Sequence, residues 1–134
     1  MRARLLHDAQ NVDQQAEALK DRTKRFAIGV LDFVETLPQT RTGDGLARQL
    51  LRAGLGVAGN YRGACRGRSH AEFTARLGVV LEEADEAELW LDIANEKSIG
   101  NPASRESLLD ESRQLRAIFS KACVTARARD RRRL

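Results

Sequence analysis

The chain has 134 residues, of which 42% are hydrophobic and 31% charged, and its formal net charge is +4. This length suits one domain with a continuous core, and the balance of residues excludes a disordered chain. No run of about 18 apolar residues is present, so no membrane span is expected. Residues 1–15 also lack the apolar stretch of a secretory signal, and we expect a cytoplasmic protein.

Residues 19–37 carry the first helical pattern, because core-type residues recur there at alternating steps of four and three. These are Leu19, Thr23, Phe26, Val30, Phe33 and Leu37. Pro38 is expected to end this helix, since proline disfavours a helical residue before it. Residues 1–14 are polar and weakly patterned, and we interpret them as a loose N-terminal lead-in.

A second helix is expected from about Gly43 to Arg66, and the short link before it predicts an antiparallel return. Its predicted core face consists of Leu46, Leu50, Ala53, Val57, Asn60 and Ala64. A row of small residues has similar spacing: Ala53, Gly56, Asn60, Gly63 and Gly67. Because glycine is a poor helix former, we expect close packing of another helix along this row.

Two further helices follow. Ser69 and Glu72 form a capping box at the start of the third helix, which should end near Lys97. Its stripe is Phe73, Leu77, Val80, Ala84, Ala87, Leu91 and Ala94. Asn101 and Pro102 suit the start of a fourth helix, whose stripe is Leu108, Leu115, Phe119, Ala122 and Ala126. The pattern predicts an all-α fold, an antiparallel up-down four-helix bundle over residues 15–126 with long helices and short loops.

Residues 127–134 form a basic C-terminal tail. Asp130 stands there among five arginines: Arg127, Arg129, Arg131, Arg132 and Arg133. The tail carries the whole positive excess of the chain, since the other residues hold equal numbers of basic and acidic side chains. Two interpretations stay open: a mobile tail that attracts phosphate or acidic protein surfaces, and a solvated helix end with arginines near its negative pole.

Acidic residues of the third helix face arginines of the second. Arg52 lies beside the core stripe, so we expect it to be partly buried and paired with Glu83 or Glu86. Asn60 on the core face also needs hydrogen-bond partners. We interpret Arg52, Asn60, Glu83 and Glu86 as a structural polar network. Tyr61 and Trp90, the only tyrosine and tryptophan, are interface candidates, with a core-edge position as the alternative for Trp90.

The sequence offers no motif for catalysis or metal binding. Cys65 and Cys123 stand far apart inside helical patterns, and we interpret both as buried free thiols. No cluster of histidine, cysteine and carboxylate has metal-ligand spacing, and no nucleophile elbow or phosphate loop occurs. We therefore expect no enzyme, no metal and no cofactor.

Residues 25–96 resemble a known family, the four-helix bundle proteins first noted as open reading frames in bacterial 23S rRNA intervening sequences. The accessory variability proteins of diversity-generating retroelements share this bundle. The matching residues are Gln49, Leu50, Arg52, Asn60, Tyr61, Arg62, Cys65, Ser69, Phe73, Leu77, Glu83, Glu86, Trp90 and Leu91. The chain departs from the pattern at Ala53 and Gly56, where many members have hydroxyl residues, and at Gly63, where many have glutamate.

The resemblance implies a bundle that assembles into a ring, commonly a pentamer, with a basic surface. In the retroelement branch that surface binds a reverse transcriptase and its RNA. Our leading hypothesis is a homo-oligomeric binding protein that contacts RNA or a nucleoprotein partner through arginines. The candidates are Arg48, Arg62, Arg66, Arg68 and the five arginines of the tail. The alternative is a protein–protein interaction scaffold without nucleic-acid binding.

Overall fold

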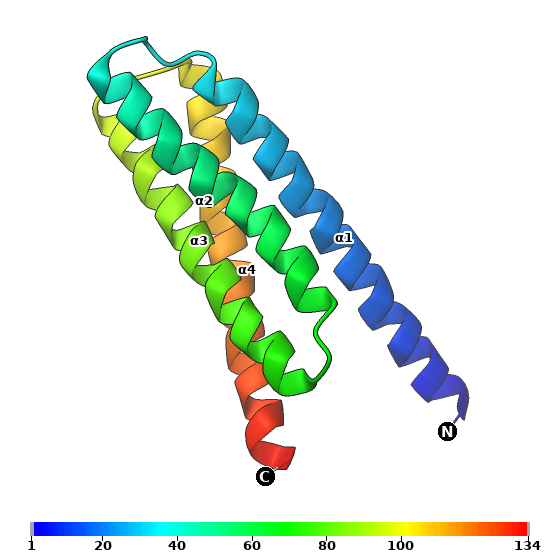
Figure 1. Ribbon diagram of the computed structural model, residues 1–134. Coiled ribbons are helices and arrows are strands. Elements are labelled where there is room, and N and C mark those ends of the chain that lie inside the picture. The colour runs from blue at the N-terminus through cyan, green and yellow to red at the C-terminus, as the bar shows by residue number, and fades with distance from the viewer. Residues whose placement is uncertain (1, 134) are drawn as a thin grey trace.

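Four long helices form the whole molecule: α1 (Arg2–Val34), α2 (Arg41–Cys65), α3 (His70–Glu96) and α4 (Pro102–Arg133). The computed structural model describes the backbone of residues 2–133 and the side chains of residues 2–132. Figure 1 shows the helices side by side, each running opposite to the one before it. No strand occurs in this described part. The predicted all-α four-helix bundle is confirmed.

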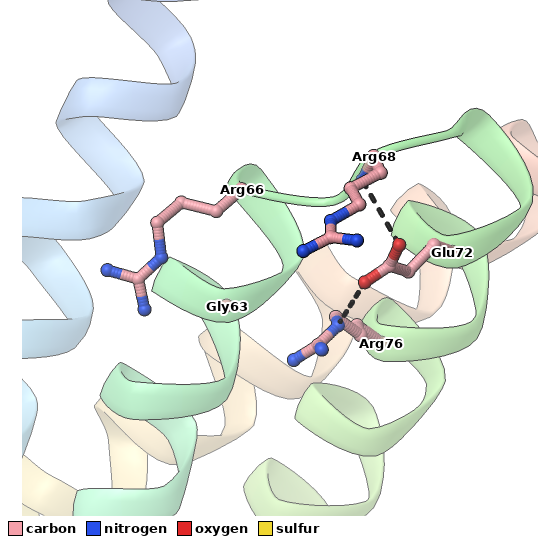
Figure 2. Close-up of a pocket in the computed structure, with 5 residues that line it drawn as sticks. All are labelled: Gly63, Arg66, Arg68, Glu72 and Arg76. Atoms are coloured by element: carbon pink, nitrogen blue, oxygen red, sulfur yellow. Dashed lines mark hydrogen bonds and ion pairs between the residues drawn. The ribbon is translucent and has the colours of Figure 1, made fainter.

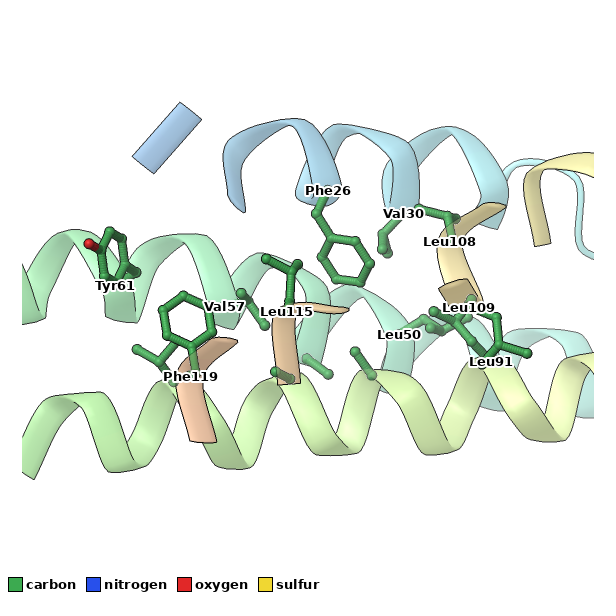
Figure 3. Packing of buried hydrophobic residues seen from close by; sticks show 14 of the residues in the cluster. Phe26, Val30, Leu50, Val57, Tyr61, Leu91, Leu108, Leu109, Leu115 and Phe119 are labelled. Carbon is green, nitrogen blue, oxygen red and sulfur yellow. The ribbon is translucent and has the colours of Figure 1, made fainter. Parts of the chain in front are cut away.

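One continuous hydrophobic core runs along the axis of the bundle and receives side chains from every helix (Figure 3). Val30, Leu50, Leu91, Leu115 and Phe119 are completely buried. The predicted stripes of all four helices reach this core, with four of their members only partly buried: Leu19, Asn60, Phe73 and Ala122. Burial of each apolar side chain contributes about 1.5–3 kcal/mol, so the stripes hold the bundle together.

The row of small residues on α2 lies against α3, as its spacing predicts. A Cβ atom at Gly56 would lie 2.8 Å from Glu83 Oε2, and one at Gly63 would lie 3.0 Å from Arg76 Nη1. The glycines therefore make room for long polar side chains of α3 along most of the seam. Only at Gly67, where the Phe73 backbone nitrogen would lie 3.1 Å from a Cβ, does backbone itself approach closely.

The links 35–40 and 97–101 lie together at one end, which we call the closed end (Figure 1). The backbone N–H of Asn101 donates to Thr36 Oγ1 at 3.0 Å and thereby joins the two links. Gly100 has a φ of 83°, and a Cβ there would meet the Phe33 ring at 2.6 Å. Both the left-handed backbone and the contact with Phe33 therefore require glycine.

A buried arginine, Arg105, completes the closed end. Its side chain is 6% exposed. Its Nε donates to Asn95 Oδ1, and its Nη1 donates to the carbonyl oxygens of Ile99 and Gly100, each at 3.1 Å. These bonds satisfy backbone groups after the end of α3 that would otherwise be buried without partners.

At the opposite end, α1 begins at Arg2, so the expected loose lead-in is wrong for residues 2–14. These residues are helical because Leu5, Ala9, Val12 and Ala16 continue the heptad stripe of α1 in register with Leu19. The helix nevertheless leans away from α4 in Figure 1, and residues 2–15 are all exposed. The stripe predicts helix there, but no core covers it.

A cleft of about 520 Å³ opens between the leaning part of α1 and the other helices. Arg22 marks its inner limit, because its guanidinium donates to both carboxylate oxygens of Glu111, at 3.0 and 2.6 Å, and to Gln114 Oε1 at 2.8 Å. Beyond this clamp, Val12 and Leu19 face Tyr61 and Leu77 across the cleft. The bundle is therefore closed at one end and open at the other.

Candidate nucleic-acid interface

The turn between α2 and α3 positions the first group of arginines. Ser69 caps α3, since its Oγ accepts from the Glu72 N–H at 3.1 Å. Glu72 Oε2 in turn accepts from the backbone N–H of Arg68 at 3.1 Å, which is one residue earlier than in the usual capping box. The predicted cap is confirmed, and it gives this turn a defined shape.

This turn forms one wall of a shallow depression of about 440 Å³, lined by Gly63, Arg66, Arg68, Glu72 and Arg76. Figure 2 shows the guanidinium groups of Arg68 and Arg76 on either side of Glu72, while Arg66 extends toward α1. Arg76 Nε lies 3.3 Å from Glu72 Oε1. One carboxylate faces three guanidinium groups, so the depression keeps a net positive charge that favours anions.

The second group of arginines lies on the last turns of α4. The helix continues to Arg133. Of the two interpretations of the tail, the structure therefore agrees with a solvated helix end and not with a mobile segment. The described tail arginines are all exposed: Arg127, Arg129, Arg131 and Arg132. The side chain of Arg133, also a candidate, lies outside the described residues.

His70 brings the two groups together. Its Nε2 lies 3.1 Å from the carbonyl oxygen of Ala126 and 3.2 Å from Asp130 Oδ1. The start of α3 is therefore fixed beside the end of α4. We call the resulting surface the basic end, and it consists of Arg62, Arg66, Arg68, Arg76, Arg127, Arg129, Arg131 and Arg132. Only Glu72 and Asp130 oppose these charges within the same segments.

The sequence analysis missed Arg76 and His70. Arg76 follows Glu72 by four residues, a spacing at which helical charges pair, so a signal for it was present. His70 had none, because its partners lie on α4. Arg48, by contrast, was a candidate but lies eighteen positions before Arg66 on α2, about 27 Å away at 1.5 Å per residue. It does not belong to the basic end.

The expected polar network is only partly formed. Arg52 is not partly buried as expected: its side chain is 70% exposed and lies 3.9 Å from Glu86 Oε2. Asn60 is half-buried beside the core face, and Tyr61 occupies the core position instead. Helical spacing alone does not separate these neighbouring residues, because they follow Val57 by three and four residues and both steps return to the same face of a helix.

Of the two alternative partners expected for Arg52, Glu83 forms no ion pair among the described side chains. Its Oε2 is buried and accepts no hydrogen bond among the described residues. Burial raises the pKa of the Glu83 carboxyl, and the charge of Glu86 raises it further, while Arg52 opposes both effects. The ionised carboxylate of Glu83 therefore destabilises the contact between α2 and α3.

Tyr61 is mainly a core residue and not a surface interface residue. It is buried, its ring centroid lies 5.3 Å from that of Phe119, and burial raises the pKa of its hydroxyl. Trp90 is half-buried at the edge of the core, and its Nε1 has no hydrogen-bond partner in the described structure. Cys123 is buried as expected, but Cys65 is only half-buried.

Metal binding and membrane insertion are two further properties relevant to function. Among the described residues, no three side chains of histidine, cysteine, aspartate or glutamate are grouped so as to hold a metal ion. None of the described helices combines the length and the apolar character needed to span a membrane.

Comparison with protein families gives a match over residues 16–121, to the family described as 23S rRNA-intervening sequence protein. The chain belongs to this family. The match extends from the clamped part of α1 through most of α4, so it covers the core and the α2–α3 turn. The resemblance inferred from residues 25–96 is confirmed and extended at both ends.

One solved structure similar to this family member is a protein with unknown function from the S23 ribosomal protein family of Bacteroides thetaiotaomicron VPI-5482. The sequences are 25% identical, the TM-score is 0.71, and the alignment covers 78% of this chain and 97% of that chain. No curated protein matches the sequence.

Proposed function

We propose that this protein is a non-catalytic, oligomeric binding protein whose basic end contacts the phosphates of RNA, free or held by a nucleoprotein partner such as a reverse transcriptase. The observation that supports this proposal is the meeting of two arginine groups at one end of the bundle, from the α2–α3 turn and from α4. Arginine donates to phosphate oxygens through two parallel N–H groups, and its charge is insensitive to pH.

Recognition at this surface is of backbone and shape, not of bases. Sequence-specific binding of single strands needs aromatic platforms on which bases stack. None of the six aromatic side chains, all in the described part of the chain, is exposed. The described end of α4 instead presents a rigid row of charges, which suits the phosphates of a structured RNA.

The ring implied by the family resemblance strengthens such binding. A single basic end offers few phosphate contacts, and each contact is weakened by salt. Several copies that present their basic ends on one assembly bind one long RNA with much higher avidity than a single copy. The mass of the protein in solution measures whether a ring forms and how many copies it holds.

Binding of a labelled stem-loop RNA, followed by fluorescence anisotropy at several salt concentrations, tests the proposal. We expect the logarithm of affinity to fall linearly with the logarithm of salt concentration. The variants Arg66→Gln/Arg68→Gln and Arg129→Gln/Arg131→Gln should each weaken binding and lower the magnitude of that slope by about 1–2. Arg41→Gln/Lys97→Gln removes two exposed charges from the closed end and is the matched control.

Affinity that is absent at low salt, or that does not depend on salt, contradicts the proposal. An equal loss in the control variant does so too, because it assigns the effect to total charge. Substitution is preferable to deletion of residues 127–134, since Asp130 contacts His70 and the deletion would also disturb the α2–α3 turn.

The alternative is a protein–protein scaffold without nucleic-acid binding. Exposed apolar residues on the outer side of α3 (Val79, Leu89 and Ile93) favour it, because exposed apolar side chains along one helix face suit association with another protein. If neither the wild type nor the basic-end variants bind RNA, and the variants keep the wild-type affinity for protein partners, the scaffold is the better description.

A further inference from the structure

Helix α3 carries two apolar stripes, and only one of them is used within the bundle. The inward stripe fills the core, as described above. An outward stripe also follows steps of four and three: Ala75, Val79, Glu82, Glu86, Leu89 and Ile93. Its apolar members Val79, Leu89 and Ile93 are 41%, 50% and 38% exposed. A helix that is apolar on opposite sides is usually covered on both.

Helix α2 has an outward stripe of its own beside this one, with the same spacing: Arg48, Arg52, Leu55, Gly59 and Arg62. Leu55 is its exposed apolar centre. Each outward stripe is therefore a heptad pattern with apolar residues set among charges, and such patterns are typical of helices that pack side by side with another helix.

The two stripes carry opposite charge. Between residues 45 and 65, α2 has no carboxylate, and between residues 77 and 96, α3 has no basic side chain. Most of these charges are unused within the molecule: Arg48, Arg62 and Glu82 form no ion pair among the described side chains. Arg52 and Glu86 approach only to 3.9 Å. Each stripe thus complements the other in charge and spacing.

Three helical glycines give an independent indication of an outside contact. A Cβ at Gly45 or Gly59 on α2, or at Gly78 on α3, would meet no atom within 4 Å. Other glycines do meet their own chain: a Cβ at Gly54 would lie 2.8 Å from Val30, and Gly56 similarly accommodates Glu83. Glycine weakens a helix, so Gly59 and Gly78 carry a cost that no contact inside the molecule explains.

We propose that the outward α3 stripe of one copy packs against the outward α2 stripe of a second copy, with Gly59 and Gly78 allowing close approach of the helices. This inference deepens the oligomeric part of the proposed function and rests on it, and its surface shares only Arg62 with the basic end. The occupant is a second copy because the chain itself supplies the acidic and apolar stripe that the basic and apolar stripe of α2 requires. Opposite charges across the contact fix the pairing and disfavour α2–α2 and α3–α3 contacts.

Charge reversal on each stripe tests the pairing, with mass in solution as the readout. The variants Arg48→Glu/Arg52→Glu and Glu82→Lys/Glu86→Lys each place like charges across the contact, and each should weaken self-association by more than about 100-fold. Both variants lose the same exposed Arg52–Glu86 contact, so any effect of that loss is common to them. Mixed in equal amounts, the two variants should bind each other and give a larger mass than either variant alone, since an α2–α3 contact between unlike copies is again complementary.

Substitutions without charge provide a second test. Leu89→Ser should weaken self-association by about tenfold or more, while Leu31→Ser, a similarly exposed leucine on α1, should not. Gly78→Ala should raise the melting temperature by a few degrees at concentrations where the protein is monomeric, and yet weaken self-association. If Gly78 faced only solvent, Gly78→Ala would raise the melting temperature without weakening self-association.

A wild-type protein that is monomeric at high concentration overturns the inference, as do reversed variants that keep the wild-type mass or fail to assemble when mixed. Circular dichroism establishes that each variant is folded. The variant Arg66→Gln/Arg68→Gln should keep the wild-type mass, so failure of RNA binding and failure of assembly are measured separately. Association of the α3 stripe with a different protein only, and never with itself, also contradicts the inference.

Discussion

The two ends of the bundle are built from the same kind of helix but are stabilised differently. At the closed end, both links are joined by hydrogen bonds, Gly100 lies against Phe33, and Arg105 satisfies the groups that follow α3. At the basic end, α1 leans away from α4, a cleft opens, and exposed arginines gather around the α2–α3 turn and the end of α4. Polar groups at the first end are bonded within the fold, whereas most arginines at the second end are exposed to solvent.

Arginines at the two ends of the molecule therefore differ in role because one is buried and the others are exposed. Arg105 is surrounded by carbonyl oxygens and holds a chain reversal in place. Arg66 and Arg68 lie in the α2–α3 turn and line an open depression (Figure 2). Substitutions should therefore affect stability at one end and binding at the other.

The largest contrast is expected for leucines. Leu91→Ala near the closed end should lower the free energy of unfolding by about 2–5 kcal/mol, because Leu91 is completely buried and the substitution leaves a cavity. Leu5→Ala, at a position that is 63% exposed, should change it by less than about 0.5 kcal/mol. Denaturant unfolding measures both. A similar loss at the two sites would show that residues 2–15 are packed in solution.

The next effect concerns Arg105. Arg105→Met removes the guanidinium group and leaves Asn95 Oδ1 and two partly buried carbonyl oxygens without their donor, which should cost about 2–3 kcal/mol. Arg127→Met removes an exposed arginine from the basic end and should leave stability within about 0.5 kcal/mol. If the two substitutions prove equal, the closed end does not depend on this arginine.

A smaller contrast lies on α3 between two glutamates. Burial raises the pKa of Glu83, so the folded protein binds this proton more tightly than the unfolded chain does. Rising pH therefore removes stability between the ordinary glutamate pKa and the raised value. Glu83→Gln should stabilise the protein by up to about 1 kcal/mol at neutral pH, with the gain disappearing as the pH falls toward the ordinary value.

Glu88 provides the control for Glu83, because it forms ion pairs with Arg113 and Arg116. Glu88→Gln removes these pairs and should cost up to about 1 kcal/mol at neutral pH. Thermal melts of both variants from pH 4 to pH 8 compare the two residues. Equal signs at neutral pH would show that Glu83 has a partner in solution.

The smallest free energies of local opening are expected at the start of α1, and hydrogen exchange measures them. Residues 2–15 form an exposed helix, and an isolated helix of this length is marginal in water, so their amides should exchange with little protection. Amides of residues 26–34 lie in the packed part of the same helix and should exchange only on global unfolding. Protection that is uniform along α1 would mean that the cleft is closed in solution.

Most of the fold was predictable from the sequence, because heptad stripes determine which side of each helix is buried. The caps at Ser69 and Asn101 were predictable for the same reason, since they depend on neighbours three residues away. The first half of α1 was not, because Leu5 and Val12 carry the pattern among many polar residues and no packing reinforces it. Arg105 was also missed, although it stands three residues before Leu108 on the core stripe.

The candidate site was predictable only as a set of arginines. Arg66, Arg68 and the described tail arginines meet because α2 and α4 end on the same side, which follows from the up-down topology. The contact of His70 with Asp130 depends on how far α4 extends past α3, and sequence spacing does not determine that distance. The exposure of Arg52 and the unsatisfied carboxylate of Glu83 likewise depend on side-chain rotamers within the seam.

The unequal burial of the two cysteines supplies the molecule with a native chemical probe. Cys123 lies in the core, where burial raises the pKa of its thiol and slows its reaction with alkylating reagents. Cys65 is half-buried and lines the cleft beside α1. Its rate of alkylation therefore reports the separation of α1 from the bundle without any engineered label, and RNA that bridges α1 and the basic end would be detected as protection of that single thiol.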